Sequence, residues 1–408
     1  MPEPIVIVGA SLAGLRAAQA IRRGGHEGDV VVVGTEEHLP YTRPPLSKEL
    51  LAGEQEPEQT ALPGRDLDVQ WRLGTTAVDL DWAAHEVTLD GGERLRYDKL
   101  LVATGARPRH WPGDPLELEG LHMLRDIDDA LALRAAFARS PRVAVVGAGF
   151  IGCEVAATAR KLGLEVTVVD IAHQPMPALG DEVGARCAEM HREHGVDLRL
   201  GVGVEGFDGH GRLEAIRLAD GSRIETDLAV VALGAIPNTD WLIESGLELQ
   251  PGVVCDATLA ARDADDVFAA GDAAAWPHPM ADGGTIRIEH WTNAAEQGAA
   301  AGRNMLAAED ERTPYAAVPY FWSDQYDVKI QAVGLPARAE RVQMLESSPE
   351  GDKWVAAGVR DGRMVAAIGW GATRRLAFYR GRLAQMPPID DVVAAVAGDE
   401  KALGAPRA

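Results

Sequence analysis

Short apolar runs alternate along this chain with helical segments, and glycine-rich turns join them. The run IVIV, beginning at Ile5, enters such a turn at Gly9, and the run VAVV enters another at Gly147, 138 residues later. A second pair of apolar runs, within LLVATGARPR and VVALGAIPN, reaches Gly105 and Gly234, which are 129 residues apart. The chain therefore contains the same unit twice. Strands that alternate with helices predict an α/β fold built on parallel, doubly wound sheets.

The turn at Gly147 carries a complete G-x-G-x-x-G pattern. Gly147, Gly149 and Gly152 follow the apolar run and open the next helix. Glycine allows the tight turn, the close approach of a pyrophosphate and the packing of the helix on the strand. Asp170 ends the run EVTVVD 18 residues past Gly152, where an acidic side chain can hold a ribose 2′-OH. Because the helix N-terminus also offers unpaired N–H groups to phosphates, the pattern predicts a dinucleotide site.

The first turn departs from this pattern at one position. Its middle residue is Ser11, between Gly9 and Gly14. Serine is the next smallest polar residue, and its hydroxyl can face a phosphate. Glu36 follows 22 residues past Gly14, just after the run DVVVVG. We interpret Ser11 as a tolerated variant in a second working site, rather than as the mark of a decayed site kept only for packing.

Length, composition and charge narrow the classes of protein. The length of 408 residues corresponds to two or three domains. Apolar residues make up 46% of the chain and charged residues 25%. No apolar run approaches the roughly 18 residues of a membrane span, and no secretory signal precedes the first strand, so we expect a cytoplasmic protein. The net charge of −22 disfavours nucleic acid and anionic membranes as partners.

The three cysteines, Cys153, Cys187 and Cys255, are scattered along the sequence without a C-x-x-C pattern. This spacing argues against a disulfide framework, a zinc site or a dithiol redox centre. Each cysteine is expected to be a small buried hydrophobic residue, and no metal site is predicted.

Four further segments carry a family resemblance. They are LPYTRPPLSKELL from Leu39, VFAAGDAA ending at Ala274, IEHWTNAAEQG and PYFWSDQYD. With the two glycine-rich turns, these motifs resemble the FAD-dependent, NAD(P)H-dependent ferredoxin reductases of oxygenase systems, which include putidaredoxin reductase-like and rubredoxin reductase-like proteins. The resemblance runs from the N-terminus through at least residue 330. It implies FAD and NADH as cofactors and a two-iron two-sulfur ferredoxin as partner.

The resemblance also implies roles for individual residues. On the FAD side the matching positions are Gly9, Ser11, Ala13, Gly14, Arg43, Lys48, Val78, Arg125, Asp272, which holds the ribityl chain, and Trp291. On the nicotinamide side they are Gly147, Gly149, Ile151, Gly152, Glu154, Asp170 and Gly234. Many relatives place an acid directly after the second strand, where this chain has Thr35 followed by Glu36. Which of these two residues binds the adenosine ribose stays open.

Lys48 and Glu154 are the candidate catalytic residues. Reduced flavin carries negative charge, so a cation beside it favours reduction, and Glu154 could neutralise and orient Lys48 in a buried pair. The alternative interpretation is a surface lysine and a glutamate that is favoured near a helix start.

The order of the motifs predicts an interrupted domain. Because VFAAGDAA follows the nicotinamide unit, the FAD-binding domain comprises residues 1–112 and 238–316, and the NAD-binding domain comprises residues 113–237 between them. Residues 317–408 form a C-terminal α+β domain, with short strands followed by about thirty residues of helix. The oligomeric state is expected to be a monomer or a weak dimer.

The leading interpretation is a ferredoxin–NAD(+) reductase that feeds an oxygenase. A reductase of rubredoxin or of a monodehydroascorbate-like acceptor, and a redox-signalling flavoprotein, stay open as alternatives. Disulfide and peroxide reductases need a cysteine close to the flavin, whereas this chain has Pro44, Pro45 and Leu46 there.

A docking patch for the ferredoxin is predicted in the segment TRRLAFYRGR. Ferredoxins of this type are generally acidic and this chain is acidic too, so docking needs a local group of positive charges within the short reach left by salt screening. The candidates are Arg374, Arg375, Arg380 and Arg382.

Overall fold

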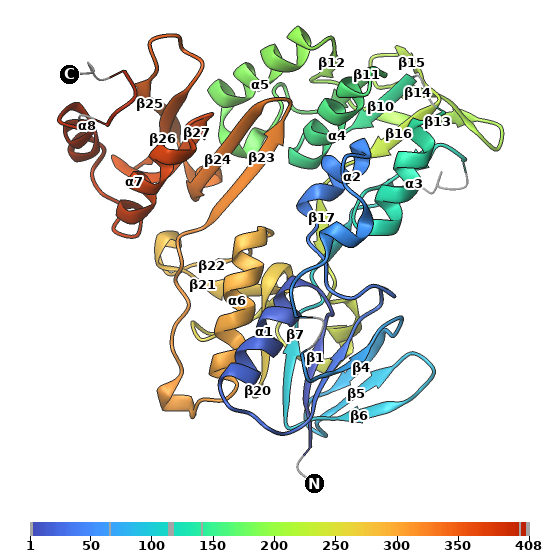
Figure 1. Cartoon of the computed structure of the whole chain (residues 1–408), viewed down its shortest axis with the longest axis vertical. Coiled ribbons are helices and arrows are strands. Elements are labelled where there is room, and N and C mark those ends of the chain that lie inside the picture. The colour runs from blue at the N-terminus through green and yellow to red at the C-terminus, as the bar shows by residue number, and fades with distance from the viewer. Residues whose placement is uncertain (1–2, 65–66, 113–117, 140–141, 400, 405–408) are drawn as a thin grey trace. The chain divides into compact units, whose positions relative to one another are not determined.

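The computed structural model describes residues 3–64, 67–112, 118–139, 142–399 and 401–404 (Figure 1). The chain divides into two compact units. Unit 1 comprises residues 1–42, 60–107 and 236–319, and unit 2 comprises residues 43–59, 108–235 and 320–408. Among the described residues, no helix is both long enough and apolar enough to cross a membrane.

The core of unit 1 is a six-stranded sheet. In the order of pairing its strands are β19 (Ala260–Ala261), β20 (Ala264–Ala269), β7 (Lys99–Val102), β1 (Ile5–Val8), β2 (Val30–Val33) and β3 (Gln70–Arg72). All neighbours pair in parallel except β19 and β20, which are antiparallel. β1 and β2 are entirely apolar and entirely buried, as expected where both faces of a parallel sheet are covered.

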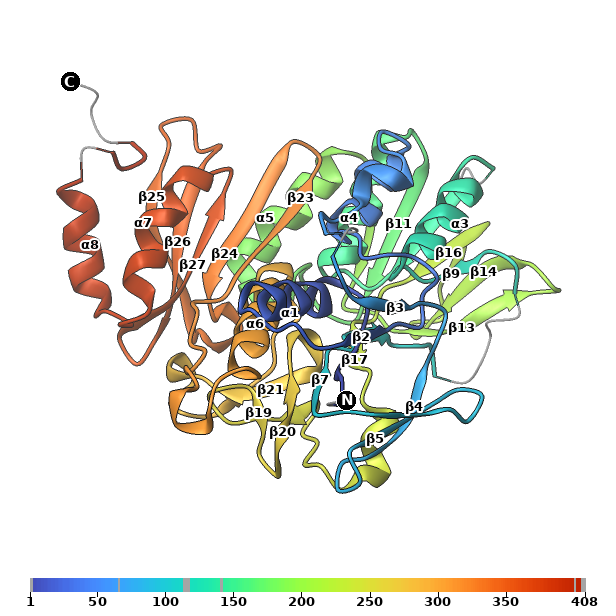
Figure 2. The ribbon, with the colours of Figure 1, turned by 60° about the horizontal axis from the view of Figure 1, so that its bottom comes forward.

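Two helices of unit 1, α1 (Leu12–Arg23) and α6 (Trp291–Asn304), lie side by side (Figure 2). Glycine permits their close approach. A Cβ atom at Gly298 would lie 2.2 Å from the carbonyl oxygen of Ala13, and one at Gly302 would lie 2.6 Å from that of Ala17. Any larger residue at these two positions of α6 would push the helices apart.

Smaller elements complete unit 1. One antiparallel sheet contains β4 (Ala77–Asp81), β5 (Glu86–Leu89) and β6 (Arg94–Arg96), and another small sheet contains β18 (Val253–Val254), β21 (Ala274–Pro277) and β22 (Thr285–Ile286). Short 3₁₀ helices are η4 (Asp240–Ser245), η5 (Gly271–Ala273), η6 (Pro279–Ala281) and η7 (Glu309–Glu311). The chain passes from unit 1 to unit 2 within β8 (Ala106–Pro108) and returns within β17 (Ala235–Pro237).

Unit 2 repeats the parallel sheet. Its strands, in the order of pairing, are β12 (Asp197–Leu200), β11 (Glu165–Asp170), β10 (Arg142–Val146), β16 (Leu228–Val231) and β9 (Leu121–His122). The helices of this part are α3 (Ile127–Phe137), α4 (Phe150–Lys161) and α5 (Asp181–Glu193), with the short helix η3 (Pro177–Leu179). A hairpin-like sheet of β13 (Val204–Gly209), β14 (Leu213–Leu218) and β15 (Arg223–Glu225) is attached.

The segment 43–59 belongs to unit 2, although the sequence analysis places it within the first FAD-binding stretch. It contains η1 (Pro44–Ser47), α2 (Glu49–Ala52) and most of η2 (Pro57–Thr60). Arg43, at its start, donates a hydrogen bond to the Arg125 carbonyl oxygen at 2.7 Å. The segment that carries Lys48 is therefore tied to the rest of unit 2.

The C-terminal part of unit 2 is an antiparallel sheet with two helices. The strands pair in the order β23 (Tyr320–Gln325), β24 (Val328–Gly334), β27 (Arg363–Trp370), β26 (Trp354–Arg360) and β25 (Arg341–Ser347), and the helical elements are η8 (Pro336–Arg338), α7 (Thr373–Leu383) and α8 (Ile389–Ala397). The predicted fold class is confirmed, with two parallel α/β sheets and a C-terminal α+β domain.

Candidate functional site

The first glycine-rich turn, between β1 and α1, is shaped by steric necessity. Gly9 has φ +129°, and a Cβ there would lie 2.0 Å from the Ala103 carbonyl oxygen. A Cβ at Gly14 would lie 2.0 Å from the carbonyl oxygen of Gly9. Ser11 is the N-cap residue of α1, yet its side chain makes no capping hydrogen bond. The serine thus leaves the N–H groups of the first turn of α1 open to an anion.

The segment VFAAGDAA, which ends at Ala274 and contains Asp272, lies against this turn. η5 begins at Gly271, and a Cβ atom added there would lie 3.3 Å from the Cβ of Ala13. The N–H of Gly271 donates a hydrogen bond to Gln297 Oε1 at 2.9 Å. Asp272, the next residue, is buried. Trp291 opens α6, and its indole N–H donates to Thr42 Oγ1 at 3.2 Å. The structure therefore brings Ala13 and the Gly271–Asp272 segment together within unit 1.

The residues after β2 differ in their surroundings. Thr35 is exposed and accepts a hydrogen bond from Thr76 Oγ1 at 3.2 Å. Glu36 is half-buried, and its carboxylate accepts a hydrogen bond from the Tyr41 hydroxyl. Val78, on β4, is 47% exposed.

The second turn, between β10 and α4, has the same two steric requirements. Gly147 has φ +110°, and a Cβ there would lie 2.3 Å from the Ala232 carbonyl oxygen. A Cβ at Gly152 would lie 2.0 Å from the carbonyl oxygen of Gly147. Gly149 is different, because it has φ −74° and a Cβ there would meet no atom within 4 Å. The protein itself does not require glycine at this position, so the space beside it is available to a ligand.

Asp170 ends β11 beside this turn. Its carboxylate accepts hydrogen bonds from the N–H of Ala148 at 2.5 Å and from the N–H of Ala172 at 2.7 Å. The first of these bonds ties the acid to the glycine-rich turn itself. Ile171 and Ile151 are 77% and 43% exposed, and Gly234 has φ +87° with open space around it. Of the predicted nicotinamide-side residues, the structure therefore brings Asp170 and the turn from Gly147 to Gly152 together at the N-terminus of α4.

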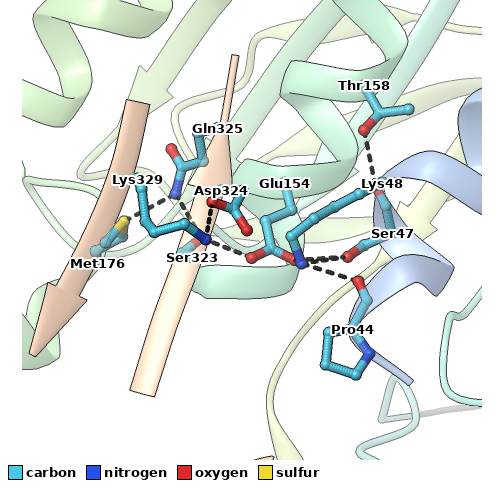
Figure 3. A network of polar contacts seen from close by, with 10 residues as sticks. All are labelled: Pro44, Ser47, Lys48, Glu154, Thr158, Met176, Ser323, Asp324, Gln325 and Lys329. Carbon is cyan, nitrogen blue, oxygen red and sulfur yellow. Dashed lines mark hydrogen bonds and ion pairs between the residues drawn. The ribbon is translucent and has the colours of Figure 1, made fainter. Parts of the chain in front are cut away.

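Lys48 and Glu154 form a buried ion pair (Figure 3). The Nζ of Lys48 lies 2.6 Å from Oε2 of Glu154, and the two side chains are only 11% and 7% exposed. Lys48 also donates to the Pro44 carbonyl oxygen at 2.9 Å. The alternative interpretation, a surface lysine with an unrelated glutamate, is inconsistent with this geometry. A charged group that is largely removed from water is stable only when an opposite charge compensates it, and here the two side chains compensate each other.

Two serines complete the surroundings of Glu154. Ser47 donates to Oε2 at 2.5 Å, and Ser323, on β23, donates to Oε1 at 2.7 Å. Thr158, one turn after Glu154 on α4, donates to the Ser47 carbonyl oxygen at 2.7 Å and fixes that segment. Sequence analysis did not single out these residues, because serine and threonine carry no signal for burial.

A cavity of about 340 Å³ adjoins the ion pair. Lys48 lines one part of it, and Tyr326 and Lys329 line another. Lys329 is paired with Asp324 at 2.5 Å. The lysine of the buried pair thus borders a polar cavity within unit 2.

The cysteines are all buried, as expected, but two of them lie together. The thiols of Cys153 and Cys187 and a ring nitrogen of His191 lie within 4.8 Å of one another. Hydrogen bonds with Cys153 and with His191 lower the pKa of the Cys187 thiol to about 6, although burial acts in the opposite direction. Sequence spacing missed this group because its members come from two different helices.

The predicted arginine patch requires a correction at Arg375. This side chain is buried, and it donates to both carboxylate oxygens of Glu346 at 3.0 Å and to Asp399 at 2.8 Å. Its charge is compensated internally, so it is not part of a surface patch. Arg374 and Arg382 are exposed on α7, and Arg382 lies 3.6 Å above the ring of Phe378.

Comparisons with known proteins agree with this architecture. The family model described as pyridine nucleotide-disulphide oxidoreductase matches residues 3–298, and the model described as reductase C-terminal matches residues 320–402. Rhodocoxin reductase of Rhodococcus erythropolis is 38% identical over 342 residues, which cover 82% of this chain and 79% of the relative. The biphenyl dioxygenase system ferredoxin–NAD(+) reductase component of Paraburkholderia xenovorans is 36% identical over 383 residues, covering 92% and 91%.

Solved structures give the same picture. Putidaredoxin reductase, in its covalent complex with putidaredoxin, matches with a TM-score of 0.89 at 29% identity, covering 97% of this chain and 99% of that one. The resemblance to the ferredoxin reductases of oxygenase systems is confirmed. This chain therefore belongs to the pyridine nucleotide-disulphide oxidoreductase family and also carries the domain described as reductase C-terminal.

Proposed function

We propose that this protein is a flavoprotein that takes hydride from NADH onto FAD and passes electrons singly to a two-iron two-sulfur ferredoxin serving an oxygenase. The observation that carries the proposal is that one chain contains two strand–turn–helix units whose turns require glycine, at Gly9 and at Gly147. Two such sites suit a pair of dinucleotides. Relatives named as ferredoxin–NAD(+) reductase components support the choice of acceptor.

Unit 1 is proposed to hold FAD. The turn from Gly9 to Gly14 would receive the pyrophosphate, and the buried Asp272, packed beside Ala13, would hold the ribityl chain. Glu36 is the better candidate for the adenosine ribose than Thr35, since its carboxylate can accept two hydroxyl hydrogens while still bonded to Tyr41. Val78 and Trp291 are proposed FAD contacts of unit 1 by their match to the family, and Arg43 and Arg125, which belong to unit 2, match FAD-contacting positions of the family as well.

Unit 2 is proposed to hold NADH. The open space at Gly149 fits a pyrophosphate, and Asp170 retains acceptor capacity for the ribose hydroxyls beyond its two backbone bonds. Residues 171–173 include no arginine that would bind a 2′-phosphate, which favours NADH over NADPH.

Lys48 and Glu154 are proposed to act on the charge of the flavin. Bound FAD supplies the redox chemistry, because it accepts two electrons together and releases them singly. Lys48 would stabilise the negative charge of the reduced state, and Glu154 holds Lys48 in place through their 2.6 Å contact. No side-chain general acid is required.

The direct test is NADH-driven reduction of cytochrome c, with and without a two-iron two-sulfur ferredoxin. The ferredoxin should raise the rate strongly, and a rate independent of ferredoxin would contradict the proposed acceptor. The purified protein should also hold one FAD per chain without a covalent link. Asp272→Ala should lose FAD much more readily than Asp170→Ala, which serves as the matched control.

A further inference from the structure

Glu154 is one end of a buried chain of hydrogen bonds that reaches into the C-terminal domain (Figure 3). Ser323 Oγ lies 2.7 Å from Glu154 Oε1, and Gln325 Nε2 lies 3.1 Å from Ser323 Oγ. Gln325 Oε1 lies 2.9 Å from His191 Nε2, and His191 Nδ1 lies 3.1 Å from the Tyr326 hydroxyl. The three middle members, Ser323, Gln325 and His191, are at most 1% exposed.

The direction of each bond follows from the charge at Glu154. A carboxylate can only accept, so Ser323 donates to it, and the serine oxygen then accepts from the Gln325 amide nitrogen. Gln325 Oε1 is left as an acceptor, which requires a hydrogen on His191 Nε2. The Tyr326 hydroxyl can donate to Nδ1 when that nitrogen carries no hydrogen. The charge on Glu154 thus requires a hydrogen on His191 Nε2 through two intervening side chains.

The strand that carries this chain is unusual for a buried strand. In β23 the buried positions alternate, and they hold Phe321, Ser323 and Gln325. A buried polar side chain stabilises a fold poorly unless its hydrogen bonds are satisfied, and an apolar residue would normally occupy such positions. On this buried face Ser323 bonds Glu154 directly, and Gln325 bonds Ser323.

We propose that Ser323 and Gln325 are positioning residues for Glu154, so that the C-terminal domain helps to fix the charge and orientation of the Lys48–Glu154 pair. The inference rests on the proposed function, in which Lys48 lies beside the flavin. It gives the C-terminal strands a part in hydride transfer in addition to any part in docking the ferredoxin.

The first experiment follows the His191 tautomer by ¹⁵N NMR, with and without FAD. The wild-type protein should show the Nε2–H tautomer. Glu154→Gln should produce a mixture, because an amide at position 154 can donate to Ser323 and no longer fixes the direction of the chain. Gln331→Leu is the control, since Gln331 is a buried glutamine of the same sheet that bonds Tyr320 instead. His191 signals that are the same in all three proteins would overturn the proposed coupling.

The second experiment measures the flavin midpoint potential and the rate of flavin reduction by NADH. Ser323→Ala should move the potential in the same direction as Lys48→Ala and slow reduction about tenfold, as expected for one lost hydrogen bond to a charged group. Ser323→Thr, which keeps the hydroxyl, should restore both. If Lys48→Ala shifts the potential but Ser323→Ala does not, the positioning role is wrong. If Lys48→Ala itself changes nothing, the proposed place of Lys48 fails, and the His191 signals still decide the coupling.

Discussion

Alanine at Gly149 separates the binding of a dinucleotide from the stability of the fold. A Cβ at this position meets no protein atom within 4 Å, and its φ of −74° suits any residue. Replacing glycine there gains about 0.4–1 kcal/mol from the unfolded chain, while alanine is a poorer N-cap by a similar amount. The net change in the free energy of unfolding should therefore stay within about 1 kcal/mol.

The matched variant is Gly152→Ala, three residues further along the same turn. Its Cβ would lie 2.0 Å from the Gly147 carbonyl oxygen, which is backbone and cannot rotate away. Such overpacking costs about 1–3 kcal/mol. At roughly 2–4 °C per kcal/mol, the thermal midpoint should fall by several degrees.

Alanine at Gly149 is expected to weaken binding of the dinucleotide, although it has little effect on the stability of the fold. If the pyrophosphate occupies the open space, the added methyl group collides with it, and a cost of about 1–3 kcal/mol lowers affinity roughly 5- to 150-fold. Calorimetry with ADP-ribose measures this loss without any hydride transfer, and a thermal scan of each variant measures stability. Gly149→Ala with wild-type affinity for ADP-ribose would refute the assignment of the space. Gly152→Ala with an unchanged midpoint would refute the steric argument.

Four further predictions follow from the same structure. In its proposed place beside the adenosine ribose, Asp170 would repel a 2′-phosphate, so kcat/KM should favour NADH over NADPH by at least about tenfold, and equal values would contradict this role. Lys48→Ala should make the flavin potential more negative and slow flavin reduction in stopped-flow traces, whereas unchanged values would leave the ion pair a purely structural role. Arg374→Glu combined with Arg382→Glu should raise the KM for ferredoxin and flatten its salt dependence without altering reduction by NADH, and wild-type kinetics at low salt would remove these arginines from docking. Burial lowers the pKa of His290 from 6.5 to about 4, so the stability it contributes is complete above pH 6.5 and is lost as the pH falls towards 4. His290→Asn should therefore lose less stability than the wild type across that range, by at most about 3 kcal/mol in pH-dependent thermal scans, and parallel curves would contradict the assignment.

Local steric rules made the glycine-rich turns predictable from sequence. The requirement for glycine at Gly9 and Gly147 arises from backbone atoms of the same small unit, and the strand and helix around each turn are visible as sequence patterns. The place of Asp170 follows from the length of one strand–helix–strand unit. By contrast, Lys48 and Glu154 are far apart in the chain, and only the family resemblance suggested that they meet.

Arg375 shows where reasoning from a single helix fails. The segment around it forms the expected helix, α7, and its dense positive charge suggested an exposed face. The partners that bury this arginine, Glu346 and Asp399, lie outside that helix, on β25 and after α8. A sequence reveals the charge of a side chain but not the distant carboxylate that will compensate it. Arg374, its neighbour, has no such partner among the described contacts and stays at the surface.

The same limit applies to β23, with the opposite consequence. In the sequence YFWSDQ, alternation alone does not decide which face is buried, and a polar residue such as Ser323 or Gln325 would ordinarily be assigned to the solvent side. The structure buries them because each polar atom of the serine and of the glutamine finds a partner in the chain that ends at Glu154. Satisfied hydrogen bonds thus outweigh the polar character of the residues. The pattern of burial in this strand therefore depends on the carboxylate of Glu154. That residue lies on α4, so the sequence of the strand alone does not reveal the pattern.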